Sequence, residues 1–210
     1  MGKRRRRHIS LKVLLVNYNI DNKVISCVLS QEQIDRIYSL VDSCPENKIK
    51  APNDYGQLAF FIDEFDSRES GAEDIYLSIE NMLKAEYDID LKIEAIQFVR
   101  YTTKSGNPAW LPPHYDKVFK KPMITVDIQM NSNIVWPVYV NGNSYTLNNN
   151  EALVFSGTHQ IHWRPKINLE DEQYLDMIFC HLEDTKAEEI SDKHRVDMKL
   201  LSTKYLNEYV

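Results

Sequence analysis

The chain has 210 residues, of which 43% are hydrophobic and 27% are charged. This balance is typical of a folded domain and excludes an intrinsically disordered or fibrous protein. No apolar run reaches the roughly 18 residues that a membrane-spanning helix needs. The net charge of −6 argues against a body that binds nucleic acid.

The N-terminal residues depart from this acidic balance, because residues 3–8 have the sequence KRRRRH. We interpret residues 1–10 as a basic, disordered tail, since a short charge run at a terminus rarely folds alone. The alternative is a segment that binds nucleic acid or an anionic membrane surface, and any nucleic-acid partner is expected only here. The following LKVLLV is too short for a secretory signal, and the three cysteines form no C-x-x-C pair. We therefore predict reduced thiols and a cytoplasmic protein.

The first part of the chain mixes strand and helix patterns. Short β-rich runs predict strands at residues 12–18, 24–28 and 57–62. Ser30 and Gln33 form a capping-box pattern, so a helix is expected to begin at Ser30 and to end before Pro45. Apolar residues at helical spacing predict a second helix over 71–87.

From residue 91 onward the apolar pattern changes to a period of two. It predicts strands at 91–101, 123–130, 136–140, 144–147, 152–155, 161–163 and 174–182. Asn141-Gly142 is a strong signal for a tight hairpin. Several short strands between turns indicate an α+β domain with a β-sandwich or barrel, whose first-half helices cover the outer face of one sheet. Residues 188–210 are predicted to form a helix that docks on the domain or makes a dimer contact.

A candidate metal site lies in the sequence WLPPHYD. His114 and Asp116 are two positions apart, so on an extended segment their side chains point to the same side. His162, which begins a later strand, is the best third ligand. His159 lies in the preceding turn, and His181 is expected to pack in the core or meet solvent. Two imidazoles and one carboxylate form the facial triad of non-haem Fe(II) oxygenases, whereas the alternative is a polar corner without metal.

Three segments carry a resemblance to a known family: QFVRYTTKSGNPAWLPPHYD, WPVYVNGNSYTLNNNEALVFSGTHQIHWR and YLDMIFCHLED. Together they resemble the Fe(II)/2-oxoglutarate-dependent dioxygenase superfamily, most closely its prolyl-4-hydroxylase-like branch. The resemblance implies one domain over 11–187 with a double-stranded β-helix (jelly-roll) core at about 91–184. It implies Fe(II) bound by the catalytic residues His114, Asp116 and His162, with 2-oxoglutarate and O₂ as co-substrates. The implied reaction decarboxylates 2-oxoglutarate to succinate and CO₂ while it hydroxylates a C–H bond.

The far carboxylate of 2-oxoglutarate needs a cationic partner. Many family members have an Arg or Lys in the strand after the distal His, but the matching INLEDEQYLDM has none. The remaining candidates are Arg164, Lys166 and Lys121. We favour Arg164, because it is two positions from His162 and points to the same side; the alternative is a surface pair with Asp171 or Glu172. The resemblance also implies that Tyr101 donates its hydroxyl to this carboxylate, unless it is an ordinary core tyrosine.

Substrate selection is expected to lie in a polar loop over 102–113, which is also the predicted lid. Trp110, Trp136 and Trp163 either stack on a substrate or only pack in the protein, and packing is favoured. A peptidyl proline, a free amino acid, a modified nucleobase and a small metabolite are all compatible substrates, and the resemblance favours a protein side chain. The competing functions are a cupin-like metal-binding protein without oxygenase activity and a non-catalytic interaction module.

Overall fold

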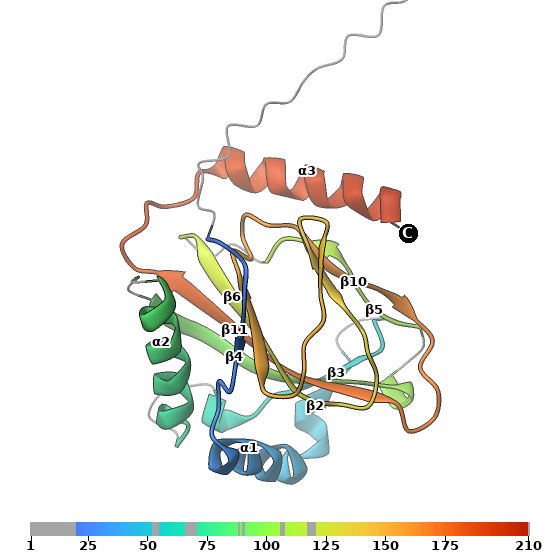
Figure 1. The fold of residues 1–210 in the computed structure, drawn as a ribbon. Helices are drawn as coiled ribbons and strands as arrows, with labels where there is room; N and C mark the ends of the chain where they lie inside the picture. Colours follow the sequence, from blue (N-terminus) through green and yellow to red (C-terminus); the bar gives the residue numbers. More distant parts are fainter. Residues whose placement is uncertain are drawn as a thin grey trace, which may run out of the picture.

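The computed structural model describes residues 20–51, 55–65, 71–87, 89, 91–105, 108–116 and 121–209. These residues form an α+β fold in which two antiparallel sheets enclose a core and helices cover them from outside (Figure 1). The predicted basic tail and the predicted strand at 12–18 lie outside the described residues. Within the described part of the chain, no helix has the length and apolar character that crossing a bilayer requires.

The larger sheet has seven strands in the order β1-β9-β6-β11-β4-β3-β2. In chain order they are β1 (Lys23–Ser26), β2 (Ile49–Lys50), β3 (Gln57–Phe60), β4 (Leu91–Thr102), β6 (Met123–Ser132), β9 (Glu151–Phe155) and β11 (Tyr174–Asp184). The long strand β11 pairs with β4 on one side and with β6 on the other. These three strands therefore form the centre of the sheet.

The smaller sheet has four strands in the order β5-β10-β7-β8. They are β5 (Ala109–His114), β7 (Val138–Val140), β8 (Asn143–Tyr145) and β10 (His162–Ile167). The predicted hairpin connects β7 to β8, and Asn141 and Gly142 both have positive φ, at 49° and 84°. A two-residue turn of this kind needs positive φ at both central positions, which Asn and Gly adopt most readily. The hairpin prediction is confirmed.

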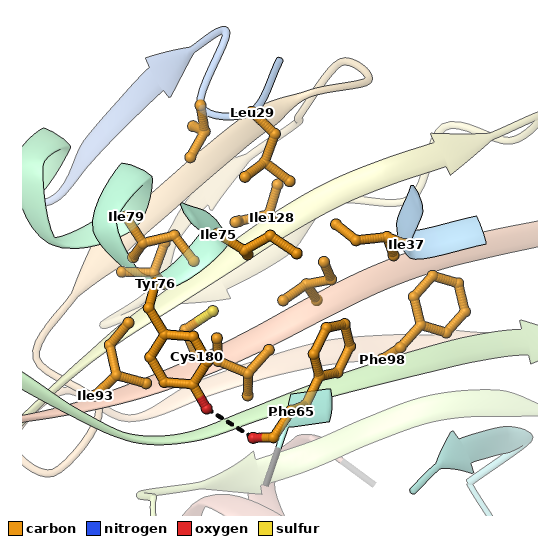
Figure 2. Packing of buried hydrophobic residues seen from close by; sticks show 14 of the residues in the cluster. Leu29, Ile37, Phe65, Ile75, Tyr76, Ile79, Ile93, Phe98, Ile128 and Cys180 are labelled. Carbon is orange, nitrogen blue, oxygen red and sulfur yellow. Dashed lines mark hydrogen bonds between the residues drawn. The ribbon is translucent and has the colours of Figure 1, made fainter. Parts of the chain in front are cut away.

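Two helices cover the outer face of the larger sheet, as predicted: α1 (Gln31–Ser43) and α2 (Glu73–Tyr87) (Figure 1). The capping box at α1 is present, because Ser30 Oγ accepts from the Gln33 amide and Gln33 Oε1 accepts from the Ser30 amide. Figure 2 shows Ile37 of α1 and Ile79 of α2 in one apolar cluster with residues of the sheet.

The C-terminal helix α3 (Asp192–Tyr209) lies beside the smaller sheet and contacts β5 (Figure 1). Met198, on α3, is 4% exposed, so this helix buries apolar surface within the chain. The short 3₁₀ turns are η1 (Glu46–Lys48), η2 (Asp63–Phe65) and η3 (Thr103–Ser105).

The prediction of a loop over 102–113 was wrong for residues 109–113. Residues 109–114 form β5, and η3 follows the end of β4. Pro112 and Pro113 hid this strand, because proline has no N–H for a sheet ladder and is normally confined to edge strands. β5 is the edge of the smaller sheet, so the two prolines are compatible with it.

Candidate metal centre

The pairing of β5 with β10 brings the predicted ligands together. In this antiparallel pair His114 lies opposite His162, and the two ring centroids are 4.2 Å apart. Asp116 follows β5 by two residues, and its Oδ1 lies 3.7 Å from Nε2 of His114 and 3.4 Å from Nε2 of His162. One ligand atom from each residue lies within 4.8 Å of the other two. The three residues can therefore bind a single ion.

Both ligand histidines have their other ring nitrogen fixed by a backbone carbonyl. Nδ1 of His114 lies 2.8 Å from the carbonyl oxygen of Pro112, and Nδ1 of His162 lies 3.1 Å from that of Gln160. A carbonyl oxygen only accepts, so each Nδ1 carries the hydrogen and each Nε2 keeps a free lone pair. This is the usual arrangement around metal-binding histidines.

Asp116 is held by the turn that precedes β10. Its backbone N–H donates to the carbonyl of Gly157 over 2.9 Å, and its Oδ2 accepts a hydrogen bond from the Thr125 hydroxyl. A Cβ at Gly157 would collide with both the Asp116 carboxylate and the Thr125 hydroxyl. Glycine is therefore required where this turn passes the carboxylate. Oδ1 remains directed at the histidines.

The charges of the site suit a cation. Burial alone would raise the pKa of Asp116, but the attraction of the neighbouring His162 and His181 side chains outweighs it and holds that pKa well below its usual range. Burial, together with repulsion from His162, lowers the pKa of His114 to about 4. At neutral pH the site therefore presents an ionised carboxylate next to a neutral imidazole. Two nitrogen donors and one carboxylate on one side of an ion fit Fe(II) with further positions open.

A cavity of about 140 Å³ adjoins these ligands, and residues of β3, β5, β6, β10 and β11 line it. Sequence patterns alone did not identify two of the polar residues that line this cavity. His181 was expected in the core or at solvent, yet its Nε2 lies 3.6 Å from Asp116 Oδ1. Asp127 is 3% exposed, and burial is the main reason that its pKa is raised to about 6. The alternation along β6 and β11 was the available signal, since it places Asp127 with Thr125, and His181 with Phe179, on the inner face.

Arg164 lies inside the barrel. It is 1% exposed, and its guanidinium lies over the Trp136 ring, 5.4 Å from the centroid, and donates to the Trp136 carbonyl. Its Nε has no hydrogen-bond partner among the described residues. The alternative of a surface pair with Asp171 or Glu172 was wrong, because a buried side chain cannot make it.

Tyr101 is fully buried, and its hydroxyl accepts a hydrogen bond from the Gln57 amide over 3.3 Å. Gln57 lines the cavity, while Tyr101 and Arg164 are not among its lining residues. Burial raises the pKa of Tyr101, so the phenol keeps its proton. The predicted contact of these two residues with a co-substrate remains a prediction.

The other two candidate cations lie elsewhere. The Lys166 ammonium is 4.4 Å from the centroid of the Trp110 ring, and Lys121 donates to the carbonyl of Thr185. Trp136 is 5% exposed and donates to the carbonyl of Pro165 over 3.0 Å, so it packs in the core as favoured. Among the three candidates, Arg164 alone is buried between the sheets.

No protein-family model matches the sequence, and no curated protein matches it. Solved structures do match. A 2OG-Fe(II) oxygenase-family oxidoreductase from Burkholderia pseudomallei has 12% identity and a TM-score of 0.57, over 80% of this chain and 86% of that chain. A prolyl-4-hydroxylase from Pseudomonas putida has 12% identity and a TM-score of 0.55, over 77% and 91%. The epimerase SnoN, in complex with Fe³⁺ and alpha ketoglutarate, has 11% identity and a TM-score of 0.61, over 79% and 80%.

At these identities the matches show the fold alone. The chain has the α+β double-stranded β-helix fold of the 2-oxoglutarate Fe(II) oxygenases, which include prolyl hydroxylases, and this fold prediction is confirmed. It also has an intact triad of His114, Asp116 and His162 at the position where the two sheets meet.

Proposed function

We propose that this protein is an Fe(II)- and 2-oxoglutarate-dependent dioxygenase that hydroxylates a C–H bond of its substrate. One observation carries the proposal. His114 and His162 both have Nδ1 fixed by a carbonyl, and both direct Nε2 towards Asp116 Oδ1 beside a cavity. A merely structural polar corner has no need for two fixed tautomers around one carboxylate oxygen.

In this proposal the iron would supply O₂ activation and couple the decarboxylation of 2-oxoglutarate to oxidation of the substrate. The residues of the chain bind and orient. His114, Asp116 and His162 would hold the metal, and the cavity that adjoins them would receive the co-substrates. Thr125 and the Gly157 carbonyl fix Asp116, and the apolar walls from Leu111 and Phe179 limit access of water.

Arg164 is the proposed partner of the far carboxylate of 2-oxoglutarate, and Tyr101 the proposed hydroxyl donor. The buried guanidinium has an unpartnered Nε and attracts the Asp127 carboxylate and the Tyr101 hydroxyl. A carboxylate ligand would satisfy the buried charge and the free donor. Gln57 lines the cavity and donates to the Tyr101 hydroxyl, which can still donate its own proton to a carboxylate.

The first experiment is an anaerobic titration of the protein with Fe(II) and then 2-oxoglutarate, followed in the visible spectrum. A weak charge-transfer band is expected when the keto acid chelates iron at an open three-residue site. His162→Ala should lose iron binding and the band, whereas His159→Gln, in the turn before β10 and outside the cavity lining, should keep both. Iron binding without a band supports the cupin-like alternative instead. Absence of iron binding refutes the metal centre.

Arg164→Met tests the co-substrate site separately. A hydrogen bond to a charged group contributes about 1.5–3 kcal/mol. Its loss should weaken the affinity for 2-oxoglutarate about 10- to 100-fold. Fe(II) affinity should be unchanged. Lys166→Met, the matched control on the same strand, should leave both affinities as in the wild type.

The reaction type and substrate need a product assay. SnoN is an epimerase, so succinate formation alone does not establish hydroxylation. Incorporation of one atom from labelled O₂ into the product supports the hydroxylase, and its absence with turnover supports an epimerase. The similarity to a prolyl-4-hydroxylase favours peptide substrates as the first class to screen.

A further inference from the structure

His181 enters the metal centre from the larger sheet, whereas both ligand histidines come from the smaller sheet. It lies on β11 opposite Thr125 of β6, and both side chains point into the barrel. Its Nε2 is 3.6 Å from Asp116 Oδ1, as close as the Nε2 atoms of the ligands. His181 therefore faces the carboxylate from the opposite side.

Two observations distinguish His181 from the ligands. Its ring nitrogens lie outside the set whose atoms are all within 4.8 Å of one another, which comprises His114, Asp116 and His162. Ligands opposite each other on one ion, at bond lengths near 2.1 Å, are only about 4.2 Å apart. In addition, Nδ1 of His181 has no hydrogen-bond partner in the described part of the chain, whereas both ligand histidines have theirs fixed by a carbonyl. The geometry is that of a neighbour of Asp116, not of a fourth ligand.

We infer that His181 is a positioning residue for Asp116, an inference that rests on the proposed metal function. Its Nε2 faces Asp116 Oδ1 over 3.6 Å, while the Thr125 hydroxyl donates to Oδ2. A shift of about 0.5 Å brings the His181 pair to an ordinary hydrogen-bond distance. The two donors fix the plane of the carboxylate. Asp116 is then held in the one rotamer that would present Oδ1 to a bound ion.

The test measures metal binding with Co(II) alone, by competition with a chromophoric chelator, on the full chain. His181→Leu should bind Co(II) 10- to 100-fold more weakly, the usual effect of losing a residue that orients a ligand. His181→Gln should recover affinity to within about threefold, because its amide can occupy the position of Nε2. His181→Asn is the matched control, since its shorter amide reaches only the position of Nδ1 and should bind as weakly as His181→Leu.

The Co(II) visible spectrum of His181→Leu should keep the wild-type shape, since the three ligands are intact. A changed spectrum would make His181 a direct ligand and overturn the inference. It is also overturned if His181→Leu binds like the wild type, or if His181→Gln is as weak as His181→Leu. Thermal unfolding of each variant checks that the fold is retained. If the wild type itself does not bind Co(II), the proposed function fails together with the inference; if it binds and His181→Leu is unchanged, only the inference fails.

Discussion

The two faces of the larger sheet differ most along β6, although the same strand forms both. The outward residues of β6 are Ile124, Val126 and Ile128, which pack in the apolar cluster beneath α1 and α2. The inward residues are Thr125, Asp127 and Gln129, which are buried between the sheets. On β11 the outward residues Ile178 and Cys180 join the same cluster, whereas on its inward side His181 lines the metal site and Met177 belongs to a second apolar cluster.

This difference separates stability from chemistry. Apolar burial on the outer face is favourable, at roughly 25 cal/mol per Å². The space between the two sheets holds a second apolar cluster but also buries Arg164, Asp127 and the metal-site side chains, whose desolvation opposes folding. We conclude that apolar packing, most of it beneath α1 and α2, offsets the cost of the buried polar groups. Changes on the two faces should therefore have different consequences.

The largest effect is expected from Ile79→Ala on the outer face. Ile79 is fully buried in the outer cluster (Figure 2), so the cavity should lower the free energy of unfolding by about 2–5 kcal/mol. Leu77→Ala, at a 43% exposed position of the same helix, should change it by about 0.5 kcal/mol or less. Denaturant unfolding measures both. Co(II) affinity should be unaffected under native conditions, and a large loss of affinity in Ile79→Ala would contradict the separation of the two faces.

The next effect concerns Asp127 and depends on pH. Its pKa is raised from 3.8 to about 6, chiefly by burial, so its protonated form is favoured in the fold. The stability that protonated Asp127 contributes is fully present below its pKa in the unfolded chain, and it is lost as the pH rises through about 6. A difference of about two pKa units corresponds to about 3 kcal/mol. Between about pH 4 and pH 7, Asp127→Asn should therefore gain up to that amount relative to the wild type.

Denaturant unfolding at several pH values, with a chelator present, measures the Asp127 effect. Asp171→Asn, in an exposed turn, is the control and should follow the wild-type profile. Parallel profiles for Asp127→Asn and the wild type would show that burial does not perturb this carboxyl.

The smallest free-energy change is expected from Gly157→Ala. This change should be confined to the free energy of metal binding. The new Cβ would displace the Asp116 carboxylate and the Thr125 hydroxyl, so Co(II) affinity should fall about 10- to 100-fold. Ser156→Ala removes a buried hydroxyl that has no partner among the described residues, and it should leave affinity unchanged. Equal affinity in both variants would mean that the turn moves to accommodate the methyl group.

Local signals explain what the sequence could predict. The alternation along β6 and β11, the capping box at Ser30 and the Asn141-Gly142 turn each act over a few residues, and all correspond to the structure. The H-x-D spacing likewise predicts that His114 and Asp116 share a side. His162 was selected because it begins a later strand, and the register of β5 against β10 is what places it beside the other two.

What the sequence could not predict depends on long-range pairing. His181 and Asp127 reach the cavity because β11 lies between β4 and β6, and no local pattern specifies that order. The burial of Arg164 depends in the same way on Trp136, which lies 28 residues earlier in the chain. The strand β5 was missed for a local reason, since two prolines in six residues normally indicate a loop.

Those two prolines also decide how another chain can approach the metal centre. Edge strands usually invite a further strand through free N–H groups. On β5, Pro112 and Pro113 have none, the Trp110 N–H already donates to the Tyr55 carbonyl, and the Pro112 carbonyl holds His114. A peptide laid along this edge would find few backbone groups to pair with. Pairing of a further strand is therefore disfavoured here, and the edge beside the candidate metal ligands is protected from strand-mediated aggregation.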